Sequence, residues 1–507
     1  MSISMIRAQN PQEVVYAGGD LATKASALDE LVGEQVRALN QLKLDWSGSA
    51  ANAAVATAYR NIQQQHWQHE KLAALAHAMK SGGGALVAVR DVLLAWVDIA
   101  STLFDVSDSG VVTPRAPNDT APWVAIAASY TKIIQQLIES FVTTDQTVST
   151  GISAINAGWL PGNNPLPGNI DPDSLNSEQL KWMQSLAGSG DPTTGEGGVG
   201  VPNTDLSIMG MTPDGRLFTI QGDTGVGMGE TGGPGPRPAE GGHNNIIFWR
   251  MDEHGKWVVD EVVNDPFPNT PGRLPKQAED ISTIPTSTFN NGDTMYTSVM
   301  NVKNWDDGTW QTRSSQLYKS TDGGRTWEPV KPLVWTNGEA AHDNPFQVQS
   351  FAPSDDGYTY MYGTQDGRVN DGMHVARVPT DQIENPAAYE YWNGSGFDAD
   401  QYPETSPAIL APPSGYDGVG EPSVHFYDNR ALVTFNDNMG NVFTSSSTDG
   451  VTWSPPQLVT AAPGAYGVFQ SPLSGGDSID ASISLWKPYG THLVQIQNSD
   501  TRGLGAY

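Results

Sequence analysis

The chain has 507 residues, with 27 Lys and Arg against 56 Asp and Glu, and its formal net charge is −29 at pH 7. Such a polyanion repels nucleic acids and anionic membrane surfaces, so neither is an expected partner, and the absence of cysteine excludes disulfides, thiol nucleophiles and cysteine-based metal sites. Because no apolar run approaches the ~18 residues of a membrane span and no signal peptide is recognisable, we expect two or three soluble domains.

Residues 1–156 are predicted to form a helical hairpin or bundle. Apolar residues repeat at helical spacing on one face of the first helix, namely at Leu28, Val32, Val36 and Leu39. A second helix is expected to begin at Ala50 and to end at "SGGG" (81–84), because consecutive glycines disfavour helix. Two more helices are expected near 85–104 and 122–155.

A tight turn separates the first two helices. It reads "LDWSGSAANAA" (44–54) and contains Trp46-Ser47-Gly48. This WxG turn between two long helices resembles the hairpins of mycobacterial type VII (ESX) secretion substrates. The resemblance implies a helical partner or chaperone for residues 1–156 and a secreted or cell-envelope location without a Sec signal peptide. The alternative interpretation is an interaction helix pair whose turn is capped by a tryptophan.

Residues 157–203 are rich in Pro, Gly and Asn, include one short helical stretch, and are predicted to form a linker. From 204 onward short β segments alternate with Gly, Asp and Asn turns. Tryptophans recur every 61–70 residues, each after three strand-like runs, at Trp257, Trp327, Trp392 and Trp453. Four strands per repeat indicate propeller blades, so the fold class is multidomain, α plus all-β, with a five-bladed β-propeller over 204–507.

Two repeated turns belong to this scaffold. "STDGGRTW" and "STDGVTW" place Asp322 and Asp449 ahead of a tryptophan. They resemble the Asp-box hairpins of sialidase-like propellers, which lie between the third and fourth strands of a blade. Each aspartate is expected to accept hydrogen bonds from its own turn, where the glycines allow positive φ. We therefore expect a structural role for both.

The candidate site lies where innermost strands begin. In a propeller blade the first strand leaves one rim and the second returns to it, so the start of the first and the end of the second share a rim. Asp205 opens "TDLSIMGM" and Asp223 follows "LFTIQG", which predicts that these two carboxyl groups are neighbours. Two adjacent carboxyl groups with separated pKa values are what glycoside hydrolysis requires, so both are predicted to be catalytic.

Other polar residues are expected at the same rim and are predicted to bind substrate. They are His243, Asn244, Asp280, Asp343, Gln365, Glu421, Asn436 and Asp480. Neighbouring rim residues share these segments, namely His342, Asp366 and Asp437.

Residues 204–507 also resemble the mycobacterial endo-D-arabinanases of glycoside hydrolase family 183. The matching segments are "TDLSIMG", "QGDTGVG", "GGHNNIIFWR", "AHDNPFQVQSF", "YEYWNG" and "GEPSV". The resemblance implies a five-bladed propeller, internal cleavage of D-arabinofuranosyl linkages in arabinogalactan or lipoarabinomannan, and essential aspartates at Asp205 and Asp223. The long Gly- and Pro-rich segment after Asp223 departs from the pattern and affects the expected shape of the cleft.

The main alternative is a non-catalytic propeller that binds glycan or protein, in which the rim acids hold sugar hydroxyls or Ca²⁺. No cofactor is expected otherwise. A sialidase needs an arginine cluster for the substrate carboxylate, and the rim segments are poor in Arg. Two other motifs predict no site: His66 and His69 lie on a Gln-rich helix expected at the surface without a nearby acid, and "GDTGVGMGETGG" lacks the Lys and the following helix of a phosphate loop.

Overall fold

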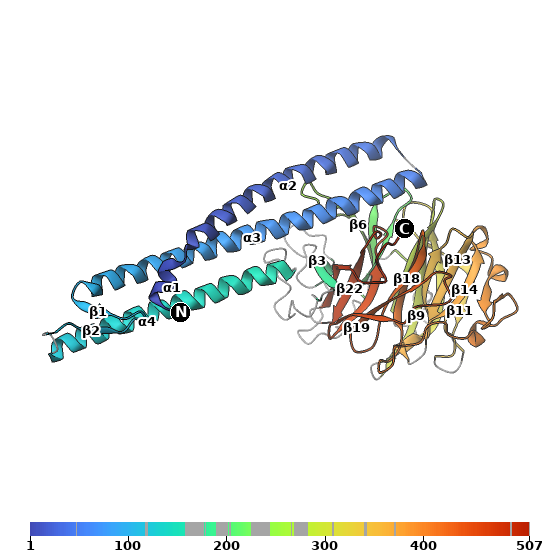
Figure 1. The fold of residues 1–507 in the computed structure, drawn as a ribbon. Helices are drawn as coiled ribbons and strands as arrows, with labels where there is room; N and C mark the ends of the chain where they lie inside the picture. The colour runs from blue at the N-terminus through green and yellow to red at the C-terminus, as the bar shows by residue number, and fades with distance from the viewer. Residues whose placement is uncertain are drawn as a thin grey trace. The chain divides into compact units, whose positions relative to one another are not determined.

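The computed structural model describes residues 1–46, 48–116, 120–157, 177, 179–188, 201, 204–224, 244–264, 266–267, 282–306, 309–338, 342–369, 372–486 and 489–505. The chain forms two compact units, Met1–Glu34 with Gln64–Gly162 and Gln35–Gln63 with Asn163–Tyr507. The prediction of an N-terminal helical segment followed by a five-bladed β-propeller is confirmed (Figure 1). None of the described helices has an apolar stretch long enough to span a membrane.

The helical segment has these elements in chain order: α1 (Ile3–Ala8), α2 (Pro11–Asp45), α3 (Ser49–Ser101), β1 (Phe104–Val106), β2 (Val112–Pro114) and α4 (Ala121–Ala157). β1 and β2 form an antiparallel pair. The first unit has its own apolar core, which includes Ile6, Leu93, Phe104, Ile134 and Phe141. Val32, on the predicted apolar face of the first helix, is fully buried.

The prediction that "SGGG" ends a helix is wrong, because α3 continues through it to Ser101. A Cβ on Gly82 would lie 2.4 Å from Val148 Cγ2 of α4, and one on Gly83 would lie 2.9 Å from Val15 Cγ2 of α2. The glycines therefore let neighbouring helices approach closely. This packing outweighs the roughly 1 kcal/mol by which each glycine disfavours a helix.

Each propeller blade is an antiparallel sheet. From the channel outward, the first three blades comprise β4 (Asp205–Met211), β5 (Leu217–Gly222), β6 (Asn245–Met251) and β7 (Trp257–Asn264); β8 (Ser282–Asn291), β9 (Thr294–Asp306), β10 (Thr309–Ser320) and β11 (Glu328–Thr336); and β12 (Val348–Pro353), β13 (Tyr358–Thr364), β14 (His374–Pro379), β15 (Glu390–Trp392) and β16 (Phe397–Asp398). The last two comprise β17 (Gly420–Tyr427), β18 (Arg430–Asn436), β19 (Asn441–Ser447) and β20 (Gln457–Ala461); and β21 (Ala465–Gln470), β22 (Ile479–Trp486), β23 (Tyr489–Ile496) and β3 (Leu180–Gly188).

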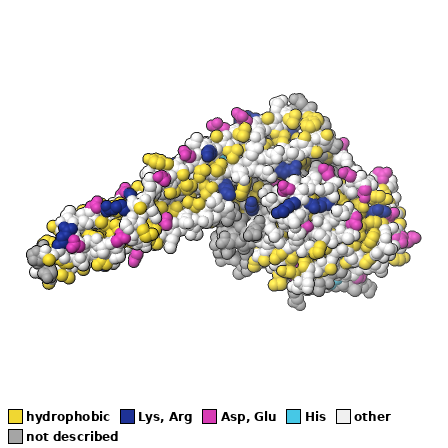
Figure 2. All heavy atoms as spheres, viewed as in Figure 1, with side chains coloured by type: hydrophobic (Ala, Val, Ile, Leu, Met, Phe, Trp, Pro, Cys, Tyr) yellow, Lys and Arg dark blue, Asp and Glu magenta, His cyan; other side chains and the backbone are white. Residues whose placement is uncertain are grey.

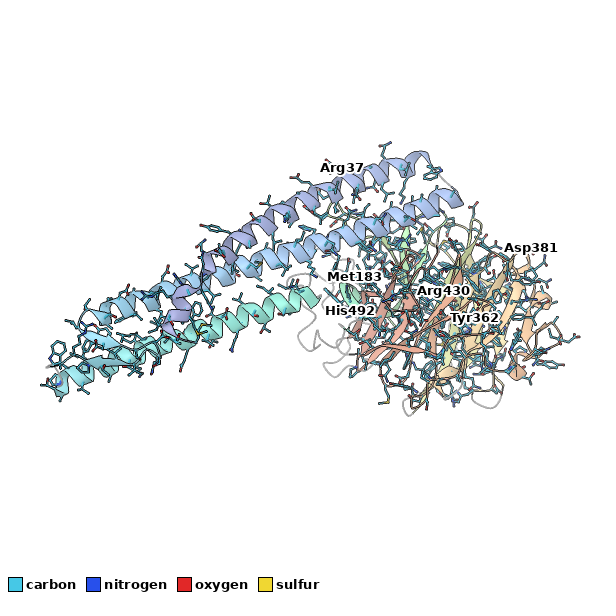
Figure 3. All side chains as sticks on the ribbon, viewed as in Figure 1. Arg37, Met183, Tyr362, Asp381, Arg430 and His492 are labelled. Carbon is cyan, nitrogen blue, oxygen red and sulfur yellow. The ribbon has the colours of Figure 1, made fainter. Side chains whose placement is uncertain are left out.

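The outermost strand of the fifth blade comes from ahead of the first blade. β3 pairs with β23, and the two strands carry Met183 and His492 respectively (Figure 3). Trp182 Nε1 donates to His492 Nδ1 at 3.3 Å. β3 lies inside the stretch predicted to be a linker, where the one regular segment was expected to be helical. The propeller therefore begins before residue 204. The segment is a strand rather than a helix because it pairs with β23, some 300 residues away in sequence.

The innermost strands β4, β8, β12, β17 and β21 contact one another in a closed ring. Both Asp boxes have the predicted geometry between the third and fourth strands of their blades. Asp322 Oδ1 accepts hydrogen bonds from the backbone N–H groups of Arg325 and Thr326, both at 3.0 Å. At the second Asp box, which contains Asp449, the hydroxyl of Tyr362 (labelled in Figure 3) donates to Gly450 O at 2.9 Å and so joins two blades.

Acidic side chains are spread over the helices and over the propeller on the face drawn in Figure 2. This distribution agrees with the excess of Asp and Glu in the sequence.

Candidate active site at the propeller rim

The fold brings Asp205 and Asp223 together as predicted. Asp205 pairs in register with Gly222 of β5, and Asp223 is the next residue. Thr204 ties the two chain segments, since its Oγ1 lies 2.9 Å from Gly222 O and 2.8 Å from Thr224 Oγ1. The carboxylate of Asp223 is close enough to Asp205 to raise its pKa. Strand topology alone therefore places these two carboxyl groups on one rim.

Three innermost strands have a β-bulge at this rim. The register shifts between Asp205 and Ile208 in the first blade. It shifts again between Gly420 and Ser423 in the fourth blade, and between Tyr466 and Phe469 in the fifth. Bulges change the direction of neighbouring side chains and are common beside active sites. Each of these bulges includes or adjoins a polar residue of the candidate site.

Left-handed backbone gathers at the same place. Among the described residues, the non-glycine residues with positive φ are Leu206, Ser207, Asp223, His342, Arg368 and Glu421. Leu206, Ser207 and Glu421 lie at the start of innermost strands, Asp223 and Arg368 follow second strands, and His342 lies in the loop that leads to β12. A left-handed non-glycine residue costs about 1 kcal/mol or more, and such residues concentrate at functional sites. The backbone thus marks this rim independently of side-chain chemistry.

The bulge after Asp205 is held by the fifth blade. Ser484 Oγ accepts from the backbone N–H of Leu206 at 2.9 Å. Ser482 Oγ donates to Leu206 O at 3.1 Å and to Ser207 O at 2.7 Å. These buried hydrogen bonds satisfy backbone groups that the bulge removes from the β4–β5 ladder, so the strained conformation is stable.

Asp205 is a buried carboxyl group with a raised pKa. Its side chain accepts a hydrogen bond at Oδ2 from the Tyr466 hydroxyl at 2.8 Å, and the Tyr489 hydroxyl also bonds this carboxyl group. Burial, followed by the charge of Asp223, raises the pKa of Asp205 to about 7, and the hydroxyls of Tyr466 and Tyr489 act in the opposite direction. Asp205 can therefore hold a proton near neutral pH.

A buried ion pair lies across the rim. Arg368 Nε lies 3.0 Å from both Oε1 and Oε2 of Glu421, and the side chains are only 16% and 7% exposed. The guanidinium also lies over the rings of Trp310 and Tyr466, at 5.0 and 5.3 Å from the centroids. The pair fixes the position of Glu421 and connects it to the tyrosine that contacts Asp205. Arg368 was not predicted from the sequence, although it lies two residues after Asp366, which was expected at this rim.

Aromatic side chains extend the site outward. Trp486 is 36% exposed, stacks on Tyr466 with the ring centroids 5.2 Å apart, and lies 5.9 Å from the ring of Tyr489. Sugar rings present apolar C–H faces that pack on such aromatic rings. The sequence did not indicate these three residues, because "SIDASI" rather than "AYGVFQ" was taken as the first strand of the fifth blade.

A histidine is oriented at the rim by a fully buried aspartate. His342 Nδ1 lies 2.9 Å from Asp366 Oδ1. Asp366 Oδ2 accepts from the Thr312 N–H at 2.6 Å and from Asn337 Nδ2 at 3.1 Å. With its Nδ1 engaged, the imidazole of His342 presents Nε2 as the second polar atom.

Several of the other predicted rim residues have structural partners. Asn244 Nδ2 donates to Thr283 O at 3.0 Å, and Asn436 Oδ1 accepts from the Gly467 N–H at 3.0 Å, so each asparagine joins neighbouring blades. Asp343 Oδ1 accepts from the Gly338 N–H at 2.7 Å within its own loop. Gln365 directly precedes Asp366 after β13, at the expected rim.

One predicted rim residue lies elsewhere in the propeller. Asp480 does not open an innermost strand but is the second residue of β22, the second strand of its blade, so it lies at the opposite end of the propeller. Burial raises its pKa to about 6. The prediction was wrong because "SIDASI" was taken as the first strand of this blade, whereas β21 precedes it and β22 is the second strand. His243 and Asp280 lie outside the described residues.

The opposite mouth of the channel is hollow. A cavity of about 680 Å³ there is lined by residues such as Met211, Asn290, Asp356 and Arg430. Its buried His425 has a pKa lowered to about 3 by burial, so it stays neutral. At the Asp205 rim, none of the described residues forms a group of three His, Asp or Glu donors close enough to hold a metal ion.

Fold and site together define a five-bladed β-propeller with a pair of carboxyl groups at one rim. A family model described as "Domain of unknown function (DUF4185)" matches residues 191–495, which is more than half of the chain. The chain therefore belongs to the DUF4185 family.

Individual proteins resemble it more remotely. The Notoamide biosynthesis cluster protein J' of Aspergillus versicolor is 26% identical over 253 residues, which are 44% of this chain and 61% of that protein. A putative hydrolase from Bacteroides ovatus has a TM-score of 0.42 and 16% identity, with 59% of this chain and 86% of that chain covered. A family 43 endo-arabinanase from Bacillus licheniformis has a TM-score of 0.36 and 10% identity, over 57% and 92% of the two chains.

Proposed function

We propose that the propeller is an endo-acting glycoside hydrolase that cleaves D-arabinofuranosyl linkages. One observation supports this most: Asp205 is a buried carboxyl group with a pKa of about 7, next to the carboxylate of Asp223. A glycoside hydrolase needs one carboxyl group that is protonated at working pH and a second that is ionised. The class of sugar rests on the resemblance of 204–507 to the family 183 endo-D-arabinanases.

In the proposed reaction Asp205 is the general acid. Its raised pKa lets it carry a proton near neutral pH, while the Tyr466 hydroxyl donates to Oδ2 at 2.8 Å. Asp205 transfers this proton to the glycosidic oxygen as the bond to the anomeric carbon breaks. Asp223 then acts as a carboxylate, either by attacking the anomeric carbon or by removing a proton from the attacking water. Two carboxyl groups and water complete this chemistry, so we propose no cofactor.

The surrounding side chains are proposed to hold the sugar. The exposed face of Trp486 packs against a sugar ring, while Tyr466 and Tyr489 hold Asp205 in position behind it. Glu421 and His342 offer polar atoms to sugar hydroxyls. Arg368 is already paired with Glu421, so it is not the cation of a sialidase-type carboxylate pocket.

The alternative is a non-catalytic propeller that binds glycan at the same rim, and the aromatic face of Trp486 suits both functions. Conservative variants of the two aspartates separate them. For a hydrolase, Asp205→Asn and Asp223→Asn lose turnover by at least about 10²-fold but still bind arabinan. A lectin shows no turnover in the parent protein, and the same substitutions reduce its binding, as measured by calorimetry with arabinan oligosaccharides.

We also propose that residues 1–156 direct export and bind a helical partner, and that the protein acts outside the cytoplasm or in the cell envelope. Trp46 supports this proposal, because it is 44% exposed beside Gly48, whose φ is +104°. A large apolar ring held outside a core at a tight turn is suited to contact another protein. The resemblance to ESX-type hairpins supplies the class of partner.

A further inference from the structure

A cluster of imidazole and carboxylate groups lies in the helical unit, far in sequence from the propeller rim. His66, His69 and Glu70 follow one another at i, i+3 and i+4 on α3, which places them on one face of the helix. One ligand atom from each lies within 4.8 Å of the other two. This corrects the sequence prediction for the two histidines, in which no nearby acid was recognised.

The neighbouring helix contributes a fourth group. Asp29 on α2 places its Oδ1 3.9 Å from His69 Nδ1, and Glu70 Oε1 lies 3.5 Å from the same nitrogen. Both separations exceed ordinary hydrogen-bond lengths. The buried Nδ1 of His69 therefore faces two carboxylates without a hydrogen bond to either.

The charges of this cluster favour a dication. The group combines two carboxylates, whose charge a dication would balance, with two imidazole rings that offer nitrogen ligands. The next cation along the helix is directed elsewhere: Lys71 Nζ donates to Asn156 O at 3.1 Å and lies over the Trp67 ring at 5.4 Å. The side chains are half-buried, with exposed fractions of 18% for His69, 26% for Glu70 and 28% for Asp29. An ion can thus reach ligands that are already partly desolvated.

We propose that His66, His69, Glu70 and Asp29 bind a divalent zinc-like cation that cross-links α2 and α3. Mixed imidazole and carboxylate ligands suit Zn²⁺, with bonds of about 2.0–2.2 Å. Tetrahedral ligands at those distances are roughly 3.4 Å apart, so side-chain rotations of about an ångström close the cluster around the ion. This proposal is independent of the proposed hydrolase function.

Calorimetric titration of the full chain with ZnCl₂ tests the site. We expect about one strongly bound zinc per chain, and a loss of affinity of at least about 100-fold in the His66→Ala/His69→Ala variant. The matched control is His77→Ala, which removes an exposed histidine from the same helix and should bind zinc as the parent does. MgCl₂ should not compete, because Mg²⁺ prefers an all-oxygen octahedral site.

A second variant and a second readout guard against misfolding. Asp29→Asn/Glu70→Gln keeps both histidines and the side-chain sizes, and should weaken zinc binding at least about 10-fold with unchanged helical circular dichroism. Zinc should also raise the melting temperature of the parent protein and of His77→Ala only. The proposal is overturned if the parent chain binds no zinc, or if both cluster variants bind it as tightly as the parent.

Discussion

Replacing Asp205 by Asn removes a titrating group while keeping its size and most of its hydrogen bonding, so it affects activity and stability in opposite directions. The pKa of Asp205 rises from 3.8 to about 7 in the folded protein. At 1.36 kcal/mol per pKa unit, this shift corresponds to at most about 4 kcal/mol. The sign follows from linkage: the folded state binds the proton more tightly, so this stability is complete below about pH 4 and is lost as pH rises to about 7.

The assay pairs chemical denaturation with rate measurements across pH. At about pH 8 the Asp205→Asn variant should be more stable than the parent by up to about 4 kcal/mol, and at about pH 4 the two should be nearly equal. Turnover on arabinan should fall by at least about 10²-fold. In the parent, activity should decline above about pH 7 as the acid ionises. A stability difference that does not change with pH, or parental turnover in the variant, would refute the assignment of Asp205 as the general acid.

Other predictions concern the scaffold and the helices. Asp322→Ala removes the Asp-box hydrogen bonds and should lower stability by roughly 1–3 kcal/mol, while the rate per folded molecule is unchanged; a normal melting temperature contradicts this. A 204–507 fragment lacks β3 and leaves the edge of β23 unpaired, so it should melt lower or aggregate more than a 163–507 fragment; equal behaviour of the two argues against β3 as the closing strand. Trp46→Ala should reduce export or partner binding and leave hydrolysis by the purified protein intact; normal secretion of the variant would be evidence against a role of this turn in export.

The repeat spacing was enough to predict the propeller. Trp257, Trp327 and Trp453 recur at blade intervals and are, or lie close to, residues of outer strands. Regular spacing of this kind reveals hairpins because the paired strands of a hairpin are close in sequence. β3 could not be recognised in the same way, because its partner β23 is some 300 residues away and only closure of the ring pairs them. The "SGGG" segment was misread for a related reason, since contacts with other helices keep α3 continuous there.

The site was predictable where strand order alone decides proximity. Asp205 opens β4 and Asp223 directly follows β5, the two strands of one hairpin, so their proximity follows from the blade pattern. The hydroxyl groups that contact Asp205 come from another blade: Tyr466 and Tyr489 lie on β21 and β23, more than 200 residues later. Arg368 reaches Glu421 across blades in the same way. These contacts form only when the ring of blades closes, so they cannot be predicted from the sequence of a single blade.

Incubation of the purified full chain with mycobacterial arabinogalactan, followed by sizing of the released sugars, tests the central claim most directly. Internal cleavage predicts a ladder of D-arabinose oligosaccharides from the parent protein. The Asp205→Asn and Asp223→Asn variants should release at least about 10²-fold less at equal folded concentration. Absence of products from a parent protein that still binds the polysaccharide, or equal release by the parent and the Asp223→Asn variant, would contradict the assignment of this rim as the active site of a glycoside hydrolase.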